Sequence, residues 1–307
     1  MLVPKARLIY NPTSGHYPVT KSVVDILKVL EDAGFEASSF QTTVEVDSAK
    51  NEATRAAKAG FDLIVSAGGD GTLDQVINGI APLVTRPKVA VIPAGTANDF
   101  ARALNIPRNN FKEAAEVILK GQTQKLDIGR AYSSTNSQYF VNNAGGGHVT
   151  EVTYAPTWQQ KSIFGYSAYL LNAIKLLAGL QSRKMRLTYD TGVYEGETVL
   201  FLLGLTNSIG GFEKILPIPE FSDGNFGLLI VKPTQLNRLF RLIKLAVKNR
   251  QHLTDDDVIF VKTKTLEVEL LDQNSHGNDV NIDGEKGTAF PLSFENLTQH
   301  IEFYVNF

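Results

Sequence analysis

Three glycine-containing turns, each directly after a strand-like run, constrain the fold of this chain most strongly. NPTSG (residues 11–15) follows RLIY, GGDGT (68–72) follows FDLIVSA, and PAGTAND (93–99) follows PKVAVI. Segments with a helical period lie between them: VTKSVVDILKVLEDAG, AKNEATRAAKAG and LDQVINGI. This alternation predicts an α/β fold, a doubly wound and mostly parallel sheet with helices on both faces. Because ligands in such folds bind beyond the carboxyl ends of the strands, the turns predict a shared binding site.

The chain changes pattern after Asp127. Strand-like runs separated by turns, among them MRLTYD, TVLFLLGLTNS, FGLLIVK and VIFVKTKTLEVEL, predict a predominantly antiparallel, β-sandwich-like domain. We predict a nucleotide-binding domain at 1–127 and a lipid-substrate and metal domain at 128–293, with 294–307 returning to the first. Helical insertions are expected at 162–180 and 234–250, and the glycines at 145–147 are expected to form a flexible turn.

Composition excludes several classes of protein. The 307 residues are 43% hydrophobic and carry a net charge of −2, which gives no support for nucleic acid as a partner. The chain has no cysteine, so disulfides and thiolate metal sites are excluded and a reducing compartment fits. MLVPKARLIYNP resembles neither a signal peptide nor an anchor, and no apolar run reaches the ~20 residues that span a bilayer. We expect a soluble, cytoplasmic protein.

The GGDGT turn combines phosphate-binding features with a carboxylate. Gly68 and Gly69 allow close approach of a ligand, and Thr72 lies where free backbone N–H groups favour an anion. Asp70 should repel phosphate, and the lysine of a Walker turn is missing. A divalent cation between Asp70 and phosphate would turn this repulsion into attraction. A tight turn without a ligand is the alternative interpretation.

Five segments, in order along the chain, resemble the diacylglycerol kinase catalytic-domain family, especially the soluble bacterial lipid kinases. They are NPTSG (11–15), GGDGT (68–72), PAGTANDFARAL (93–104), KLDIG (125–129) and NIDGE (281–285). GGDGT alone is shared with NAD kinases, whereas the ordered set is more specific. The resemblance implies an ATP- and Mg²⁺-dependent lipid kinase that converts diacylglycerol to phosphatidic acid, and it implies homodimers.

The resemblance also implies roles for individual residues. Contacts with ATP would come from Asn11, Pro12, Thr13, Ser14, Gly15, Thr42 or Thr43, Gly68, Gly69, Asp70, Gly71, Thr72, Leu73, Asp74 and Thr96. Asp70, Asp99 and Asp127 resemble an acidic network that links magnesium to the nucleotide. Glu285 resembles the general base that takes the proton of the substrate hydroxyl. Asp223 resembles the side-chain ligand of a second, structural magnesium, completed by the carbonyls of Glu220 and Asn225.

Several of these residues have a purely structural interpretation. Asp283-Gly284 and Asp223-Gly224 are favoured turn dipeptides, and Asp99 could cap the helix NDFARAL. The family often has lysine after NPxSG, where this chain has His16, and Lys21 is the nearby substitute. A catalytically idle nucleotide- or lipid-binding regulator therefore stays an alternative. So does a kinase of a sphingoid base or another lipid alcohol; NAD is disfavoured by PAGTANDFAR and the C-terminal DGE.

One segment could bring the protein to a membrane. QLNRLFRLIKLAVKNRQ (235–251) has five basic residues, no acidic residue and an apolar face, which is typical of helices on anionic lipid surfaces. We expect a peripheral protein at the inner face of the membrane. A basic face in solvent, above a helix packed on the second domain, is the alternative.

Overall fold

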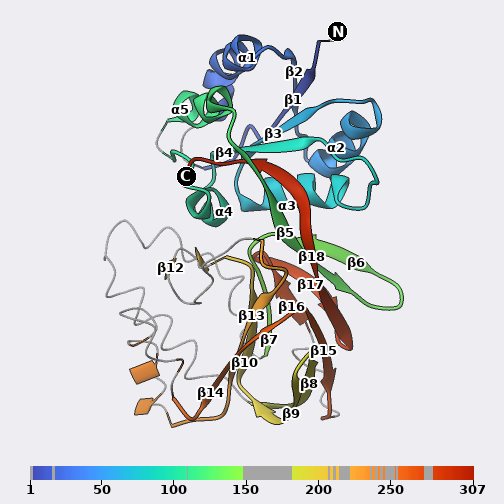
Figure 1. Cartoon of the computed structure of the whole chain (residues 1–307), viewed down its shortest axis with the longest axis vertical. Coiled ribbons are helices and arrows are strands. Elements are labelled where there is room, and N and C mark those ends of the chain that lie inside the picture. Colours follow the sequence, from blue (N-terminus) through green and yellow to red (C-terminus); the bar gives the residue numbers. More distant parts are fainter. Residues whose placement is uncertain are drawn as a thin grey trace. The chain divides into compact units, whose positions relative to one another are not determined.

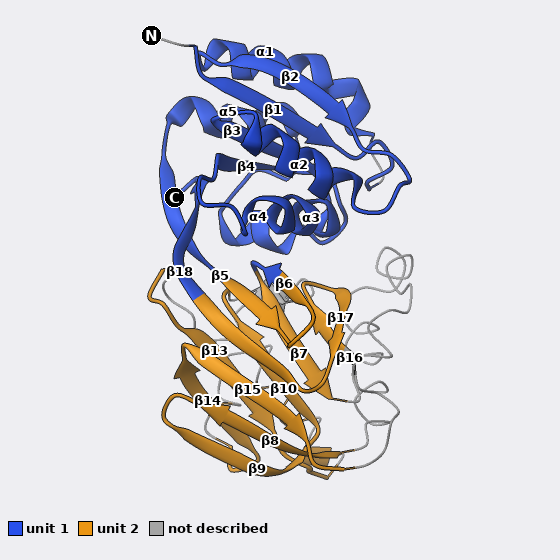
Figure 2. Cartoon of the chain, turned by 90° about the vertical axis from the view of Figure 1, so that its right-hand side faces the viewer, with its two compact units in different colours: residues 1–128, 139–141, 297–307 blue, residues 129–138, 142–296 orange. Residues whose placement is uncertain are grey.

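The computed structural model describes residues 3–15, 18–108, 110–147, 182–206, 208–209, 212–213, 222–235, 237–238, 241–242, 245, 253, 255–272 and 279–307. Contacts divide the chain into two compact units (Figure 2). Unit 1 is Met1–Ile128, Tyr139–Val141 and Leu297–Phe307, and unit 2 is Gly129–Gln138 and Asn142–Asn296. None of the helices described here has the length and apolarity needed to cross a membrane.

Unit 1 is built on a parallel sheet. Its order is β2 (Glu36–Gln41), β1 (Lys5–Tyr10), β3 (Leu63–Gly68), β4 (Lys88–Pro93) and the last part of β18 (Leu292–Tyr304). Every pair along this path is parallel, including Phe303 of β18 beside Val89 of β4. All six residues of β3 are buried, which explains why this strand reads as an unbroken apolar run.

Helices cover both faces of this sheet (Figure 1). α1 (Val23–Asp32) packs with α5 (Phe111–Glu116), and α2 (Ser48–Lys58) packs with α3 (Asp70–Ile80). α4 (Asp99–Ala103) is a single short turn of helix. Short 3₁₀ helices lie at Val19–Ser22 and Val117–Lys120. The doubly wound α/β fold predicted for the first third is confirmed.

The strand pairs described here for unit 2 are antiparallel. One sheet has the order β14 (Val258–Thr263), β13 (Phe226–Val231), β10 (Leu200–Gly204), β7 (Asn143–Gly147), β16 (Asp279–Ile282) and β17 (Glu285–Ala289). The start of β18 pairs with β15 (Thr265–Leu270), which continues to β8 (Arg183–Tyr189) and β9 (Gly192–Thr198). Ser208–Ile209 and Phe212–Glu213 form the short pair β11 and β12. The antiparallel second part predicted from the sequence is confirmed.

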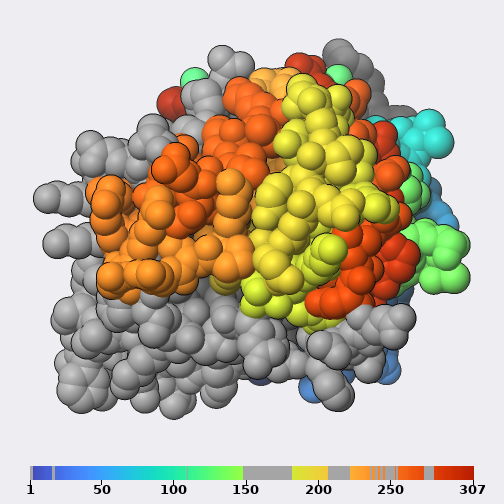
Figure 3. Space-filling model, turned by 90° about the horizontal axis from the view of Figure 1, so that it is seen from below, coloured from blue at the N-terminus to red at the C-terminus, as the bar shows by residue number. Residues whose placement is uncertain are grey.

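Segments distant in sequence lie side by side in unit 2. In the space-filling view of Figure 3, the yellow surface of the β8–β9 segment borders the orange and red surfaces of later strands. This agrees with the pairing of β8 with β15, where Leu187 lies opposite Val268. β5 (Thr123–Tyr132) and β18 each contribute residues to both units.

The expectation of a flexible turn at 145–147 is wrong. These three glycines lie in β7, between β10 and β16 in the sheet. A Cβ on Gly146 would lie 2.5 Å from Cε1 of Phe201 and 2.7 Å from Cζ of Phe290. Glycine is therefore required because aromatic rings cover this part of the strand. The helical insertion expected at 162–180 lies outside the described residues, and only part of 234–250 is described.

Candidate active site

The three glycine turns of unit 1 meet at the carboxyl ends of β1, β3 and β4. The N–H of Asn11 donates to the carbonyl of Ala67 (3.0 Å), and that of Ala94 donates to the carbonyl of Gly68 (2.8 Å). The contacts are too close for larger residues. A Cβ on Gly15 would lie 2.1 Å from the Ala94 oxygen, and one on Gly95 would lie 2.4 Å from the Gly69 Cα. The turns therefore form one backbone-lined surface.

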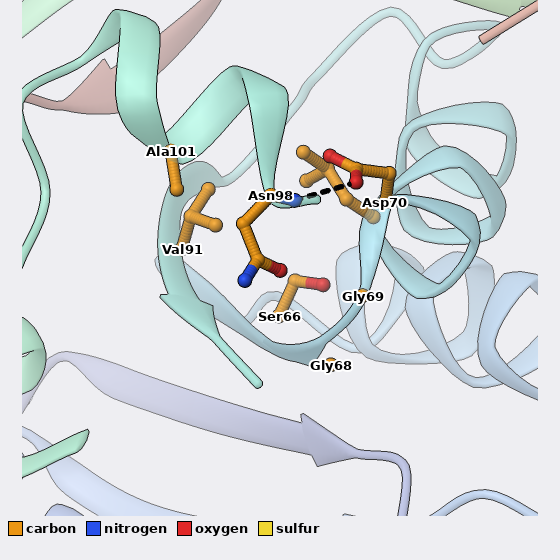
Figure 4. Close-up of a pocket in the computed structure, with 8 residues that line it drawn as sticks. Ser66, Gly68, Gly69, Asp70, Val91, Asn98 and Ala101 are labelled. Atoms are coloured by element: carbon orange, nitrogen blue, oxygen red, sulfur yellow. Dashed lines mark hydrogen bonds between the residues drawn. The ribbon is translucent and has the colours of Figure 1, made fainter. Parts of the chain in front are cut away.

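Asp70 is held at the centre of this surface. It is the first residue of α3, and its Oδ2 accepts a hydrogen bond from the Asn98 N–H (2.8 Å; Figure 4). Its Oδ1 accepts one from the Asp99 N–H (3.0 Å). The carboxylate therefore joins the GGDGT turn to the PAGTAND turn and is fixed in orientation at both oxygens.

Asn98 makes this grip possible, and the sequence analysis did not select it. Its backbone is left-handed (φ 49°), and its side chain bonds Gly95 in both directions, accepting from the N–H (3.0 Å) and donating to the carbonyl (2.7 Å). Asparagine tolerates this backbone conformation better than most residues. An Asn-Asp pair at the start of a helix after a glycine turn was the available signal.

The electrostatics of Asp70 are unfavourable without a cation. Burial, and next the neighbouring Asp99 carboxylate, raise the pKa of Asp70 to about 6, although the backbone N–H groups of Asn98, Asp99 and Phe100 oppose the shift. Nearby positive charge would reverse the penalty. Oxygen donors with few carboxylates fit magnesium, which keeps several of its waters and binds phosphates. No group of three or more acidic or histidine ligands occurs among the described residues, so such an ion would need nucleotide oxygens as well.

A small pocket lies below Asp70. Its walls include Ser66, Asp70, Leu73, Val91, Asn98 and Ala101 (Figure 4). The hydroxyl of Ser66 is buried and has no hydrogen-bond partner within the described structure. Thr72 and Leu73 are themselves buried, at 7% and 3% exposure, whereas Gly69 and Gly71 are partly open. Backbone rather than the Leu73 side chain is therefore what this turn offers to a ligand.

Residues 11–15 form a compact turn beside this site. Oδ1 of Asn11 accepts from the N–H and the hydroxyl of Thr13 (3.0 and 2.9 Å), which fixes the turn locally. Thr13 and Gly15 are exposed, and so is Thr96 of the third turn. His16 lies outside the described residues, while Lys21 is exposed in the following 3₁₀ helix.

The two adjacent threonines have different surroundings. The backbone N–H and the hydroxyl of Thr43 both point to Ser48 Oγ (3.0 and 3.4 Å), at the start of α2. Thr42 is half-buried, and its N–H donates to the carbonyl of Tyr10 at the end of β1 (2.9 Å). Thr43 thus supports the helix start, and Thr42 lies beside the first glycine turn.

Asp74 and Asp127 lie in well-defined hydrogen-bonded positions. Oδ1 of Asp74 accepts from the Asn78 side chain (3.1 Å), one turn later in α3. Asp127 is buried in β5, and its Oδ1 accepts from the N–H of Gln299 in β18 (2.8 Å). The carboxylate described beside Asp70 is therefore that of Asp99. The hydrogen bond described for Asp127 joins β5 to β18.

Glu285 follows a tight hairpin in unit 2. Asp283 and Gly284 both have positive φ (50° and 92°) between β16 and β17, so the turn interpretation of this dipeptide holds. Oδ1 of Asp283 accepts from the N–H groups of Asn142 and Asn143 (2.9 and 2.8 Å), which fixes the hairpin to the start of β7. Glu285 is the first residue of β17 and is exposed. A rigid turn thus presents this carboxylate.

The side-chain ligand proposed for a second magnesium, Asp223, has partners from the protein. Oδ2 of Asp223 accepts from Nζ of Lys262 (2.5 Å), and Oδ1 accepts from the N–H of Asn225 (2.9 Å). Glu220 lies outside the described residues. The Asp223 carboxylate, occupied by the ammonium group of Lys262, therefore does not fit a magnesium ion.

The described part of the basic segment is tied to unit 2. Arg238 pairs with Asp255 at 2.7 Å and with Asp257 at 3.1 Å, and Leu242 is buried against Leu229 and Val258. Arg241 is exposed. The segment is thus in contact with protein at Leu242, and of its two described basic side chains Arg238 is paired internally.

Comparisons with known proteins agree with these features. A model of the diacylglycerol kinase catalytic domain matches residues 5–131, and one of the YegS C-terminal NAD kinase beta sandwich-like domain matches residues 147–305. A protein of Bacillus subtilis named diacylglycerol kinase is 42% identical over 297 residues, 97% of this chain and 95% of the relative. One of Staphylococcus haemolyticus with the same name is 42% identical over 97% of this chain and 87% of its own length.

Solved structures give the same result at the level of the fold. A structure described as a putative diacylglycerol kinase of Bacillus anthracis superposes with a TM-score of 0.82 at 31% identity, covering 100% of this chain and 98% of that one. Another from the same organism has a TM-score of 0.80 at 29% identity, with the same coverage.

Proposed function

Because the chain belongs to the diacylglycerol kinase family, we propose that it transfers the γ-phosphoryl group of ATP to the free hydroxyl of diacylglycerol, forming phosphatidic acid. The observation that carries this proposal is the pair of backbone hydrogen bonds that orient the Asp70 carboxylate. This carboxylate lies at the start of a helix where three glycine turns meet. Phosphoryl transfer depends on positioning and charge neutralisation, and these turns serve both needs.

We assign the nucleotide to the three turns of unit 1. Backbone N–H groups near Gly69 and Gly71 would bind phosphate oxygens, and Thr42 rather than Thr43 would face the nucleotide because Thr43 is committed to Ser48. Asp70, supported by Asp99, would hold magnesium through its waters. Magnesium supplies positive charge to the phosphate oxygens when it is bound. Asp127 completes the acidic network in this proposal.

We assign the general base to Glu285. A lipid hydroxyl is a very weak acid, so its proton needs an acceptor as the new P–O bond forms. Glu285 is exposed and is presented by a hairpin that Asp283 fixes to the chain. The hydroxyl oxygen would attack the γ-phosphorus as ADP leaves, and the carboxylate would take the hydroxyl proton as the new P–O bond forms.

The decisive assay is transfer of labelled phosphate from ATP, with magnesium, to diacylglycerol in mixed micelles. Sphingosine, monoacylglycerol and NAD are the competing acceptors. We expect labelled phosphatidic acid, lost by at least 10²-fold in Glu285→Gln with ATP binding unchanged. Glu267→Gln, at an exposed carboxylate on β15, is the matched control and should keep full activity.

Other outcomes of this assay have defined meanings. Label in another acceptor would keep the kinase and replace the substrate. ATP binding without label in any acceptor would favour the regulator, and His16→Lys would then be the first change to make. Full activity of Glu285→Gln would remove Glu285 as the base.

We also propose that the protein works as a homodimer at the cytoplasmic face of the membrane, since its acceptor is a membrane lipid. The basic segment 235–251 supports contact with anionic lipid, although Arg238 is occupied by Asp255 and Asp257. Co-sedimentation with vesicles containing phosphatidylglycerol, compared with neutral vesicles, tests the contact. Light scattering tests the assembly.

A further inference from the structure

Asp223 lies in the turn at residues 222–225, directly before β13. Each of its acceptor groups has a donor from the protein. Oδ2 accepts from Nζ of Lys262 (2.5 Å), and Oδ1 accepts from the N–H of Asn225 (2.9 Å). The backbone carbonyl of Asp223 accepts from the Asn225 side chain (2.9 Å). The turn is therefore closed by its own chain and by one lysine.

The register of β13 and β14 places Lys262 near Asp223. β14 runs antiparallel to β13, with Lys262 opposite Gly227 and Thr263 opposite Phe226. Lys262 thus lies on the neighbouring strand near the turn that carries Asp223. The Asp223 side chain is 15% exposed and that of Lys262 is 47% exposed, so the carboxylate lies below the solvent-facing lysine.

A magnesium ion and this ammonium group could not share the carboxylate. Magnesium binds oxygen at about 2.0–2.1 Å. With Nζ at 2.5 Å from the same Oδ2, two cations would lie within about 4.6 Å of each other and repel strongly. Magnesium also demands an octahedral set of oxygen ligands, whereas Oδ1 and the backbone carbonyl of Asp223 already accept hydrogen bonds from Asn225.

We propose that Lys262 supplies the positive charge at Asp223 that a structural magnesium would otherwise supply. Unit 2 then carries an internal cation at this turn and requires no metal there for its stability. This inference goes beyond the proposed activity and is independent of it, because it concerns folding stability in the absence of nucleotide.

Thermal unfolding tests the proposal in Asp70→Asn protein, so that the carboxylate of unit 1 adds no response to magnesium. The melting temperature is measured in EDTA and in MgCl₂ on the order of 10 mM, at constant ionic strength and without nucleotide. Lys262→Met keeps the length of the side chain and removes its charge. Lys264→Met is the matched control, because Lys264 is exposed two residues further along and makes no ion pair within the described structure.

We expect magnesium to leave the melting temperature of the parent and of Lys264→Met unchanged. Lys262→Met should melt lower in EDTA and recover about 1–3 °C in magnesium, since the freed carboxylate can then bind the ion. Adding Asp223→Asn should remove that recovery. Stabilisation of the parent by magnesium that Asp223→Asn abolishes would overturn the proposal, and so would a Lys262→Met protein that ignores magnesium.

A second measurement does not depend on the folding of any lysine variant. Electron paramagnetic resonance counts Mn²⁺ bound to the Asp70→Asn protein in the absence of nucleotide. We expect the number of bound Mn²⁺ ions to be the same with and without the additional change Asp223→Asn. One ion per chain that is lost in Asp223→Asn would show a metal at this turn and refute the role assigned to Lys262.

Discussion

Replacing Asp70 by asparagine should abolish phosphoryl transfer and make the free protein more stable above pH 6. The folded-state pKa of Asp70 is raised to about 6 from an ordinary value of 3.8. A carboxyl group with a raised pKa binds its proton more tightly in the folded than in the unfolded state. Its contribution therefore favours folding at low pH and is lost progressively as the pH rises from about 4 to about 6.

The size of the effect follows from this shift. A difference of about two pKa units, at 1.36 kcal/mol each, gives a penalty of about 3 kcal/mol once Asp70 is ionised. Asparagine resembles the protonated carboxyl group, since its one oxygen can accept from either Asn98 or Asp99 while its NH2 group faces the other N–H, which reduces the gain. We expect a gain of about 2 kcal/mol at pH 8, or roughly 4–8 °C in melting temperature, and almost none at pH 4.

The assay is thermal unfolding of both proteins between pH 4 and pH 8 in EDTA. Asp32→Asn, at an exposed carboxylate at the end of α1, is the control and should give no trend with pH. Adding magnesium and ATP at pH 8 should stabilise the unchanged protein more than the variant. A difference that stays constant with pH, or a less stable variant at pH 8, would falsify the electrostatic argument.

Three further changes test the surroundings of the two units. Gly95→Ala places a Cβ 2.4 Å from the Gly69 Cα, so we expect a loss of about 1–3 kcal/mol and weaker ATP binding. Gly121→Ala has open space around its Cβ position but puts alanine at a φ of 67°, so it should destabilise through backbone strain without changing ATP affinity. Gly146→Ala places a Cβ against the rings of Phe201 and Phe290 and should lower stability by about 1–3 kcal/mol through overpacking. ATP affinity should stay unchanged in a binding assay. An unaltered melting curve would contradict the packing described for β7. Thr42→Val should raise the KM for ATP. Thr43→Val should mainly destabilise the start of α2, by about 1 kcal/mol, because it removes the hydroxyl that contacts Ser48 Oγ (3.4 Å) and accepts from the N–H of Glu45 (3.3 Å). The reverse pattern in steady-state kinetics and unfolding would exchange their roles.

The fold of unit 1 was predictable because local and global signals agree. β3 is an apolar run and Gly34 and Gly60 follow their helices with positive φ, so strand–helix alternation was visible in the residues. β7 was mistaken for a turn because glycine carries no side chain with which to report burial. Its environment is set by Phe201, 55 residues later, and by Phe290, and no local pattern contains that information.

The site was predictable only in part. Glycine and aspartate placed the turns, but the link between Asp70 and Asn98 is a contact between residues 28 apart. The ion pair of Lys262 with Asp223 joins residues that are 39 positions apart in the sequence, and it depends on the register of β13 and β14. Only tertiary structure supplies such pairings. The assignments of ATP, magnesium and proton transfer to particular residues, and the division into functional domains, stay predictions.

Asp70 and Asp223 show two treatments of a carboxylate in one chain. Asp70 receives backbone N–H groups and makes no ion pair within the described structure, so its negative charge is left for an external cation. Asp223 receives the ammonium group of Lys262 and is neutralised by the chain itself. Magnesium is then expected to act at Asp70 and not at Asp223. The magnesium concentration needed for catalysis should then equal the concentration needed for ATP binding. Removal of magnesium should leave the stability of unit 2 unaltered.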